Sequence, residues 1–196
     1  MTRYAIFVII LVGTVQGFEE SIFEDEDIYR IYVPTQPTST STIVPGTKWC
    51  GPGNTADNYN DLGSLREVDM CCRDHDHCES IIMPDVTLHN LYNSDWFPIM
   101  KCSCEQKFMN CLQEINSPAS NSLGHIYFVG RDKCFQFGHP IIECTKYQQG
   151  IIRKRCIVYK VDKFKSKIWQ LYDIPFYTSV GEAANHYVRR TAVTIN

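Results

Sequence analysis

The clearest pattern of apolar and polar positions lies in residues 68–79, a stretch without proline or glycine. Read as an α-helix with 3.6 residues per turn, it places Cys71, His75 and Cys78 on one stripe, at i, i+4 and i+7. Cys72 and Asp76 lie on a second stripe, which is turned by roughly 100° about the helix axis. One face of the predicted helix therefore presents a histidine between two cysteines.

A second helix is predicted from about Asp95 or Ile99 to Asn116, again with two cysteines seven residues apart. If the two helices run antiparallel, the first cysteine of one pairs with the last cysteine of the other. Cys71 then pairs with Cys111, and Cys78 with Cys104. Cys72, on the side stripe, then pairs with Cys50 in a glycine-rich loop before the first helix. Cys144 and Cys156 close a local loop, which leaves Cys102 for Cys134. The predicted disulfides are Cys71–Cys111, Cys78–Cys104, Cys50–Cys72, Cys144–Cys156 and Cys102–Cys134.

The rest of the body shows shorter patterns. Strand character is found at residues 125–129, 156–161 and 167–172, and the last two are expected to face each other as a hairpin. Residues 81–94 and 117–124 are rich in turn formers and are interpreted as loops. The predicted fold class is mainly α, with two antiparallel disulfide-linked helices and small antiparallel β-hairpins.

Composition divides the chain into four parts. Residues 1–17 combine a basic start, a short apolar core and small residues, as in a secretory signal peptide; a buried core helix is the alternative. Residues 18–42 are acidic and then rich in Pro, Ser and Thr, and are interpreted as a propeptide or linker. A single domain is expected at residues 43–178 and a flexible tail at 179–196. Residues 1–42 hold six acidic and two basic residues, so their removal changes the formal charge from −3 to +1.

All ten cysteines lie between Cys50 and Cys156. An even and dense set behind a signal peptide indicates a disulfide framework in a secreted, extracellular protein. A zinc site is the alternative for the histidine and cysteine run, but bridged cysteines cannot bind zinc.

A glycine-rich loop, W-C-G-P-G-N at residues 49–54, precedes the first helix. Glycines at alternate positions allow backbone carbonyls to turn inward, as a hard cation such as Ca²⁺ requires. A Cys50–Cys72 bridge would hold this loop beside Asp76, which lies on the same stripe as Cys72. His75 would then lie beside the metal without being a ligand, and could act as general base on a water molecule if a carboxylate of the second helix held it.

Several motifs together resemble group III secreted phospholipase A2, the bee-venom type. They are the W-C-G-P-G-N loop, C-C-R-D-H-D-H-C at residues 71–78, C-S-C-E-Q-K-F-M-N-C at 102–111 and G-H-I-Y-F at 124–128. The resemblance covers residues 43–177, with I-V-P-G-T at its start and V-D-K-F-K-S-K-I-W-Q near its end. It implies a phospholipase A2-like fold.

The resemblance also implies calcium-dependent hydrolysis of the sn-2 ester of glycerophospholipids, with one Ca²⁺ per chain. The implied calcium ligands are the main-chain oxygens of Trp49, Gly51 and Gly53 and the side chain of Asp76. The implied catalytic residues are His75 as the base and Tyr127 as a support of the catalytic dyad.

One position departs from the family pattern. Glu105 stands where the family has an aspartate beside the histidine, and we expect it to accept a hydrogen bond from Nδ1 of His75. The alternative function is a catalytically weak phospholipase-like ligand of a membrane or receptor, for which Glu105 is the main support. Retention of His75 and Asp76 favours the enzyme.

The expected partner is a phospholipid membrane interface, with no nucleic-acid partner and a monomeric state. The basic run at residues 153–167 is interpreted in two equally weighted ways, as a solvated strand face or as a contact with an anionic membrane surface.

Overall fold

The computed structural model describes residues 42–182. The predicted signal peptide, nearly all of the acidic segment and residues 183–196 of the predicted tail lie outside this range. The helices are α1 (Arg66–Asp76), α2 (Cys102–Ile115) and α3 (Pro118–Gly130). The strands are β1 (Ile81–Ile82), β2 (Thr87–Leu88), β3 (Leu91–Tyr92), β4 (Ile99–Met100), β5 (Lys133–Gly138), β6 (Ile141–Gln149), β7 (Lys154–Val161) and β8 (Ile168–Asp173). Within residues 42–182 no helix is both long and apolar enough to cross a bilayer.

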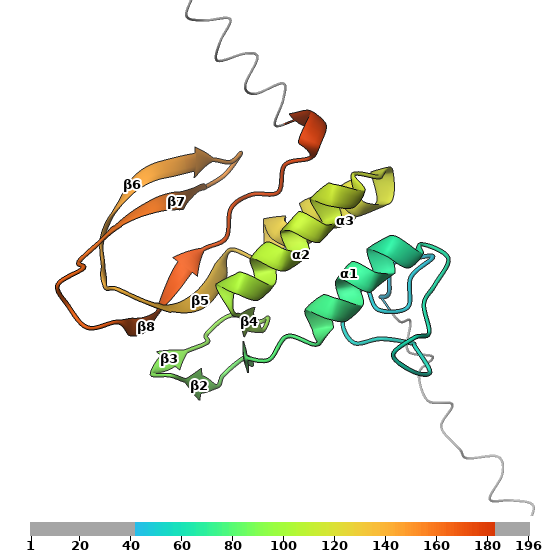
Figure 1. Ribbon diagram of the computed structural model, residues 1–196, viewed down its shortest axis with the longest axis horizontal. Helices are drawn as coiled ribbons and strands as arrows, with labels where there is room; N and C mark the ends of the chain where they lie inside the picture. The colour runs from blue at the N-terminus through green and yellow to red at the C-terminus, as the bar shows by residue number, and fades with distance from the viewer. Residues whose placement is uncertain (1–41, 183–196) are drawn as a thin grey trace, which may run out of the picture. The chain divides into compact units, whose positions relative to one another are not determined.

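The antiparallel pair of helices predicted from the cysteine spacing is confirmed, and α1 and α2 lie side by side in Figure 1. All five predicted disulfides are present. The second helix begins later than predicted, at Cys102, because Ile99 and Met100 are taken up by β4, which pairs with β1. It ends at Ile115, where Asn116 adopts the left-handed conformation (φ 46°) common after a helix.

Helix α3 was not predicted, because its residues were divided between a loop and a strand. The turn formers at its start are a helix cap. The Ser117 hydroxyl accepts a hydrogen bond from the backbone N–H of Ser120, the Ser120 hydroxyl accepts one from the backbone N–H of Ser117, and Pro118 occupies the first turn. The aromatic residues that suggested a strand face the core instead, where Phe128 is fully buried against Phe108. Tertiary packing has overridden β-propensity here.

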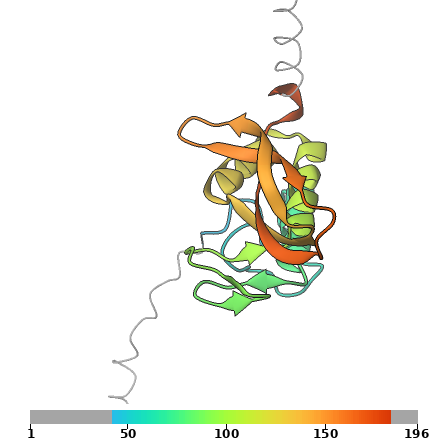
Figure 2. The same ribbon diagram turned by 90° about the vertical axis from the view of Figure 1, so that its left-hand side faces the viewer.

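The strand pairing also differs from the prediction. Residues 156–161 and 167–172 are strands, but they do not pair with each other: β7 pairs with β6, and β8 pairs with β5 in antiparallel register. The Cys144–Cys156 disulfide joins β6 to β7, and Trp169 of β8 lies opposite Phe137 of β5. These strands lie to the left of the helices in Figure 1 and stand in front of them in Figure 2.

The segment predicted as a loop at residues 81–94 contains short strand pairs. Between β2 and β3, His89 and Asn90 both have positive φ (54° and 61°), as in a two-residue hairpin turn. Together with β5 to β8, these pairs give helix and strand about equal shares, so the predicted mainly α class is wrong. The strand content comes mainly from the antiparallel pairs β6–β7 and β5–β8 after α3.

Two clusters of buried residues hold the described part together. The larger lies between the helices and includes Val68, Phe108, Leu112 and Phe128 along with buried disulfides. The buried residues that α1 contributes to this cluster are Cys71, Cys72 and Val68. The position of His75 therefore depends on cross-links as much as on apolar packing.

Candidate active site

His75 and Glu105 face each other across the α1–α2 pair, as predicted. His75 is 8% exposed and Glu105 is 2% exposed. The Nε2 atom of His75 lies 3.4 Å from Oε2 of Glu105. The Cys71–Cys111 and Cys78–Cys104 bridges hold the two helices together one turn before and one turn after His75, so the distance between imidazole and carboxylate is fixed on both sides.

The nitrogen facing Glu105 is Nε2, and our expectation that Nδ1 would face it is wrong. The side chain of His75 leaves α1 with its ring stacked on Phe108, 4.4 Å between ring centres, and this stacking sets which edge meets α2. Among the described residues Nδ1 has no hydrogen-bond partner. A cleft of about 400 Å³ between α1 and α2 opens beside the ring.

Tyr127 reaches the same pair from α3. Its hydroxyl donates to Oε1 of Glu105 at 3.1 Å and lies 3.3 Å from Nε2 of His75. Burial, and then the neighbouring Glu105 carboxylate, raise the pKa of Tyr127 well above its usual range, so the phenol stays protonated. Because the hydroxyl donates its hydrogen bond to Glu105, its oxygen can accept a hydrogen bond from an N–H at Nε2 of His75.

Two acceptors therefore surround Nε2: the hydroxyl of Tyr127 and Oε2 of Glu105. Oε2 is buried and has no hydrogen-bond partner in the part of the chain that the structure describes, so an N–H at Nε2 is its available donor. This arrangement favours the tautomer with the proton on Nε2 and the lone pair on Nδ1. The ring is thereby set up to accept a proton at Nδ1.

The glycine loop lies against α1, where the Cys50–Cys72 bridge brings the two Cα atoms to 5.1 Å. Gly53 adopts a left-handed conformation (φ 79°), which a side chain would strain. The carbonyl of Trp49 accepts from the N–H of Gly51 at 3.1 Å, and no described residue donates to the carbonyls of Gly51 or Gly53. These oxygens keep lone pairs for a cation.

Asp76 follows His75 at the end of α1. It retains solvent contact, yet the surrounding protein desolvates the carboxylate enough to raise its pKa to about 6. A positive ion beside it would relieve this penalty. The described residues contain no cluster of three His, Cys, Asp or Glu side chains, so a metal here would depend on backbone oxygens beside one carboxylate.

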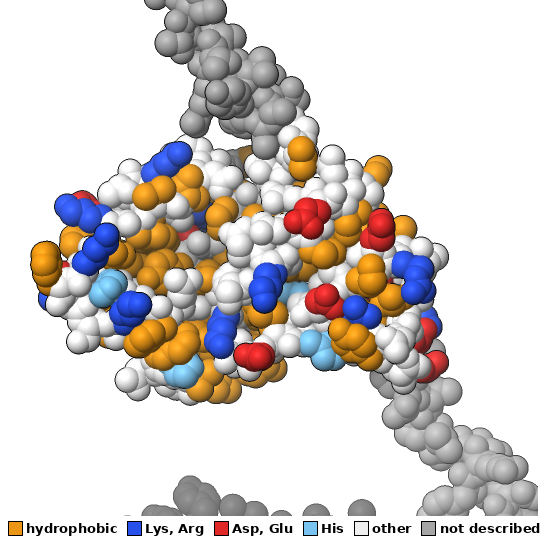
Figure 3. All heavy atoms as spheres, viewed as in Figure 1, with side chains coloured by type: hydrophobic (Ala, Val, Ile, Leu, Met, Phe, Trp, Pro, Cys, Tyr) orange, Lys and Arg blue, Asp and Glu red, His pale blue; other side chains and the backbone are white. Residues whose placement is uncertain are grey.

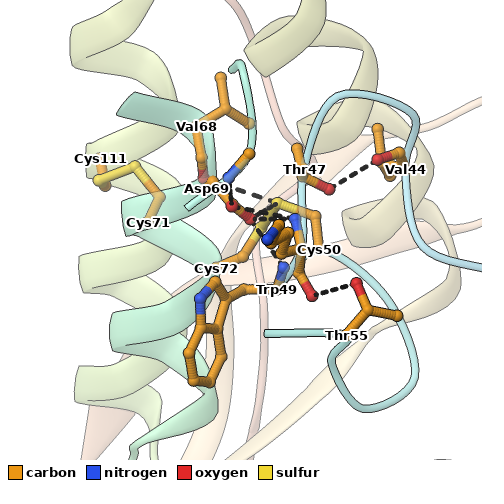
Figure 4. The surroundings of a disulfide bond; sticks show 12 residues. Val44, Thr47, Trp49, Cys50, Thr55, Val68, Asp69, Cys71, Cys72 and Cys111 are labelled. Carbon is orange, nitrogen blue, oxygen red and sulfur yellow. Dashed lines mark hydrogen bonds between the residues drawn. A yellow bond between two sulfur atoms is a disulfide. The ribbon is translucent and has the colours of Figure 1, made fainter. Parts of the chain in front are cut away.

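The sequence interpretation missed Asp69. This residue is fully buried, and its carboxylate accepts hydrogen bonds from three backbone N–H groups of the loop region: Lys48 at 2.9 Å, Trp49 at 2.7 Å and Gly63 at 2.8 Å. Figure 4 shows it next to the Cys50–Cys72 bridge. A signal was present, since Asp69, Cys72 and Asp76 share one helical stripe at i, i+3 and i+7.

Comparison with known proteins gives this arrangement its context. A family profile described as phospholipase A2 matches residues 43–138. The phospholipase A2 of Apis dorsata is 36% identical over 137 residues, which are 69% of this chain and 99% of the relative. The chain belongs to the phospholipase A2 family. Two further relatives with the same name are those of Apis mellifera (36% identity; 69% of this chain, 80% of the relative) and Xylocopa aruana (39% identity; 67% and 72%).

These bee relatives confirm the predicted bee-venom type of phospholipase A2. The family profile spans the glycine-rich loop at residues 49–54, α1, α2 and α3, so His75, Glu105 and Tyr127 all lie inside the matched segment of this phospholipase A2. The β6–β8 region lies beyond it.

Proposed function

We propose that this phospholipase A2 hydrolyses the sn-2 ester of glycerophospholipids, with His75 as the general base and one Ca²⁺ per chain. The observation that carries the proposal is the buried cluster of His75, Glu105 and Tyr127, in which Nε2 of the histidine faces two acceptors and Nδ1 has no hydrogen-bond partner among the described residues. Family membership supplies the substrate class.

The residues present fit a calcium ion. The main-chain oxygens of Trp49, Gly51 and Gly53 and the carboxylate of Asp76 would hold it, because carbonyl and carboxylate oxygens are the ligands that Ca²⁺ prefers. The unpaired carbonyls of Gly51 and Gly53 and the raised pKa of Asp76 support this assignment. When bound, a calcium ion polarises the ester carbonyl and stabilises the negative charge that develops on its oxygen.

In the proposed reaction His75 takes a proton from water at Nδ1, and the water oxygen attacks the ester carbon. The bond between that carbon and the sn-2 oxygen of glycerol then breaks, and the imidazolium returns the proton to this oxygen, so that a fatty acid and a lysophospholipid leave. Glu105 and Tyr127 hold the Nε2–H, which fixes the tautomer, and the Glu105 carboxylate stabilises the imidazolium as it forms. The longer side chain of glutamate still reaches the imidazole, as the 3.4 Å distance shows. This contact supports the enzyme over the alternative of a silent ligand.

The setting of the reaction is also part of the proposal. A phospholipid membrane interface is the proposed site of action, and five disulfides are typical of the extracellular protein that we expect. A monomeric state is part of the same proposal.

His75→Gln tests the role of the base. We expect it to lower the initial rate on phospholipid vesicles by on the order of 10²–10⁴-fold or more, while calcium affinity measured by titration calorimetry stays nearly unchanged. His125→Gln is the control, because His125 contacts Tyr177 and Glu182 rather than His75 or the glycine loop, and should keep the rate. Full rescue of His75→Gln by excess calcium would show that the histidine is not the base.

A further inference from the structure

The turn between β7 and β8 carries an aromatic ring that folding does not use. Phe164 is fully exposed, at the tip of a turn formed by residues 162–167. Exposing a phenylalanine side chain instead of burying it forgoes the stabilisation that removal of its apolar surface from water would give. A lone exposed apolar residue is ordinary, so the surroundings of Phe164 decide its meaning.

The turn is firmly built. The N–H of Phe164 donates to Oδ1 of Asp162 at 3.1 Å, and the N–H of Lys165 donates to the Asp162 carbonyl at 3.3 Å. Nδ1 of His139 lies 2.9 Å from the carbonyl of Lys165, which attaches the turn to the end of β5. The phenylalanine ring is thus held outward by a defined backbone, so little conformational entropy would be lost on contact with a partner.

Lysines flank Phe164 along the chain. Lys163, Lys165 and Lys167 are exposed on either side of Phe164, and the only nearby acidic partner in the described residues is Asp162, whose Oδ2 lies 3.7 Å from Nζ of Lys165. No described acidic side chain pairs with Lys163 or Lys167. Two apolar residues, Ile168 and Phe137, are about half exposed on the neighbouring strand ends.

We propose that the turn at residues 162–168 is a membrane anchor that inserts Phe164 into the surface of an anionic lipid bilayer. An aromatic ring suits the boundary between headgroups and acyl chains, and each lysine near an anionic surface is attracted to it and strengthens binding. Figure 3 shows Lys and Arg side chains gathered over the end of the molecule that β6 to β8 form.

A lipid surface fits this turn better than a folded protein partner does. The apolar part consists of Phe164 with Ile168 and Phe137, which is far too small for a stable protein interface of about 800 Å² on each partner. Insertion of one ring among lysines needs no such area. The inference rests on the proposed function only in its choice of lipid as partner.

The test measures binding without hydrolysis. The purified protein is mixed, in a calcium chelator, with vesicles of non-hydrolysable diether phosphatidylcholine, with and without an anionic diether lipid. We expect Phe164→Ser to weaken binding to anionic vesicles by about tenfold. Ile152→Ser is the matched control, because Ile152 is almost fully exposed at the opposite end of β7 and should bind as wild type.

The charges are tested in the same assay. Lys163→Gln with Lys167→Gln should reduce the preference for anionic vesicles by on the order of tenfold, whereas Lys146→Gln with Lys154→Gln makes the same change in net charge elsewhere and should have little effect. Phe164→Trp should show a blue shift and bromolipid quenching beyond those of wild type. Equal losses in both lysine pairs or in both apolar variants would overturn the anchor, as would a Phe164→Trp spectrum unchanged by vesicles.

The two proposals fail in different ways. Phe164→Ser should hydrolyse a monomeric short-chain phospholipid at the wild-type rate, because the turn does not belong to the His75 cluster. A wild type that binds vesicles through Phe164 but hydrolyses nothing would refute the catalytic proposal alone. A wild type that hydrolyses vesicles with no dependence on Phe164 would refute the anchor alone.

Discussion

Glu105 illustrates how one added methylene group can be accommodated at the proposed catalytic site. Its carboxylate is buried, receives the Tyr127 hydroxyl on one oxygen and faces His75 with the other. The resemblance to the family identified this residue and its partner, but not the imidazole nitrogen involved, because the ring orientation is set by stacking on Phe108. Such a contact between distant residues leaves no trace in local sequence.

Glu105→Gln keeps the size of the side chain and removes its charge. We expect kcat to fall by about 10²-fold or more, with little change in KM, because the imidazolium loses its stabilising partner. Glu105→Asp should retain most of the rate. Initial rates on vesicles at saturating calcium provide the measurement, with Glu114→Gln, exposed on the same helix, as the control. Equal rates in wild type, Glu105→Gln and Glu105→Asp would show that Glu105 does not serve the dyad.

Tyr127→Phe leaves a buried carboxylate oxygen without its donor. The free energy of unfolding should fall by about 1–3 kcal/mol, and the rate should fall less than in Glu105→Gln, since the carboxylate itself remains. Denaturant unfolding and initial rates measure the two effects. Tyr92→Phe removes a hydroxyl that binds exposed Asp85 and should change stability by no more than about 0.5 kcal/mol. A similar stability for both variants would contradict the buried contact.

At the scale of elements, the cysteine spacing was the most informative signal. It predicted the pairing of α1 with α2, because disulfides restrict which helical faces can meet. Helix α3 and the strand partners were not predictable in the same way. The Ser117 cap resembles a loop in composition, and the choice of β6 rather than β8 as the partner of β7 depends on contacts distant in sequence.

The dependence of the glycine loop on α1 gives a prediction for Asp69. Asp69→Asn replaces one acceptor oxygen by an amide that points hydrogens at backbone donors, so the loop should be less well formed. We expect calcium affinity to fall by about tenfold in titration calorimetry. Asp74→Asn, an exposed change on the same helix, should leave the affinity unchanged. Unaltered calcium binding in Asp69→Asn would show that the loop forms without this carboxylate.

At the scale of the whole molecule, the folded state of the described region depends on its disulfides for stability. The Cys71–Cys111 bridge closes a separation of 40 residues between α1 and α2. Its removal in Cys71→Ala with Cys111→Ala should lower the free energy of unfolding by about 4 kcal/mol, from the loop-closure entropy of the unfolded chain. The corresponding change at Cys144 and Cys156, which lie 12 residues apart within one hairpin, should cost less and leave the hydrolysis rate nearly intact. Denaturant unfolding distinguishes the two, and a larger loss for the hairpin pair would contradict this ranking.

Three of the five disulfides end on the helix that carries His75 or directly after it, at Cys71, Cys72 and Cys78. In a glutathione-reduced compartment such as the cytosol these attachments do not form. The helix then lacks most of what places its imidazole opposite Glu105 and its end beside the glycine loop. We therefore expect the enzyme to become active only when these disulfides form, so that a copy retained in the cytosol leaves the membranes of its own cell intact.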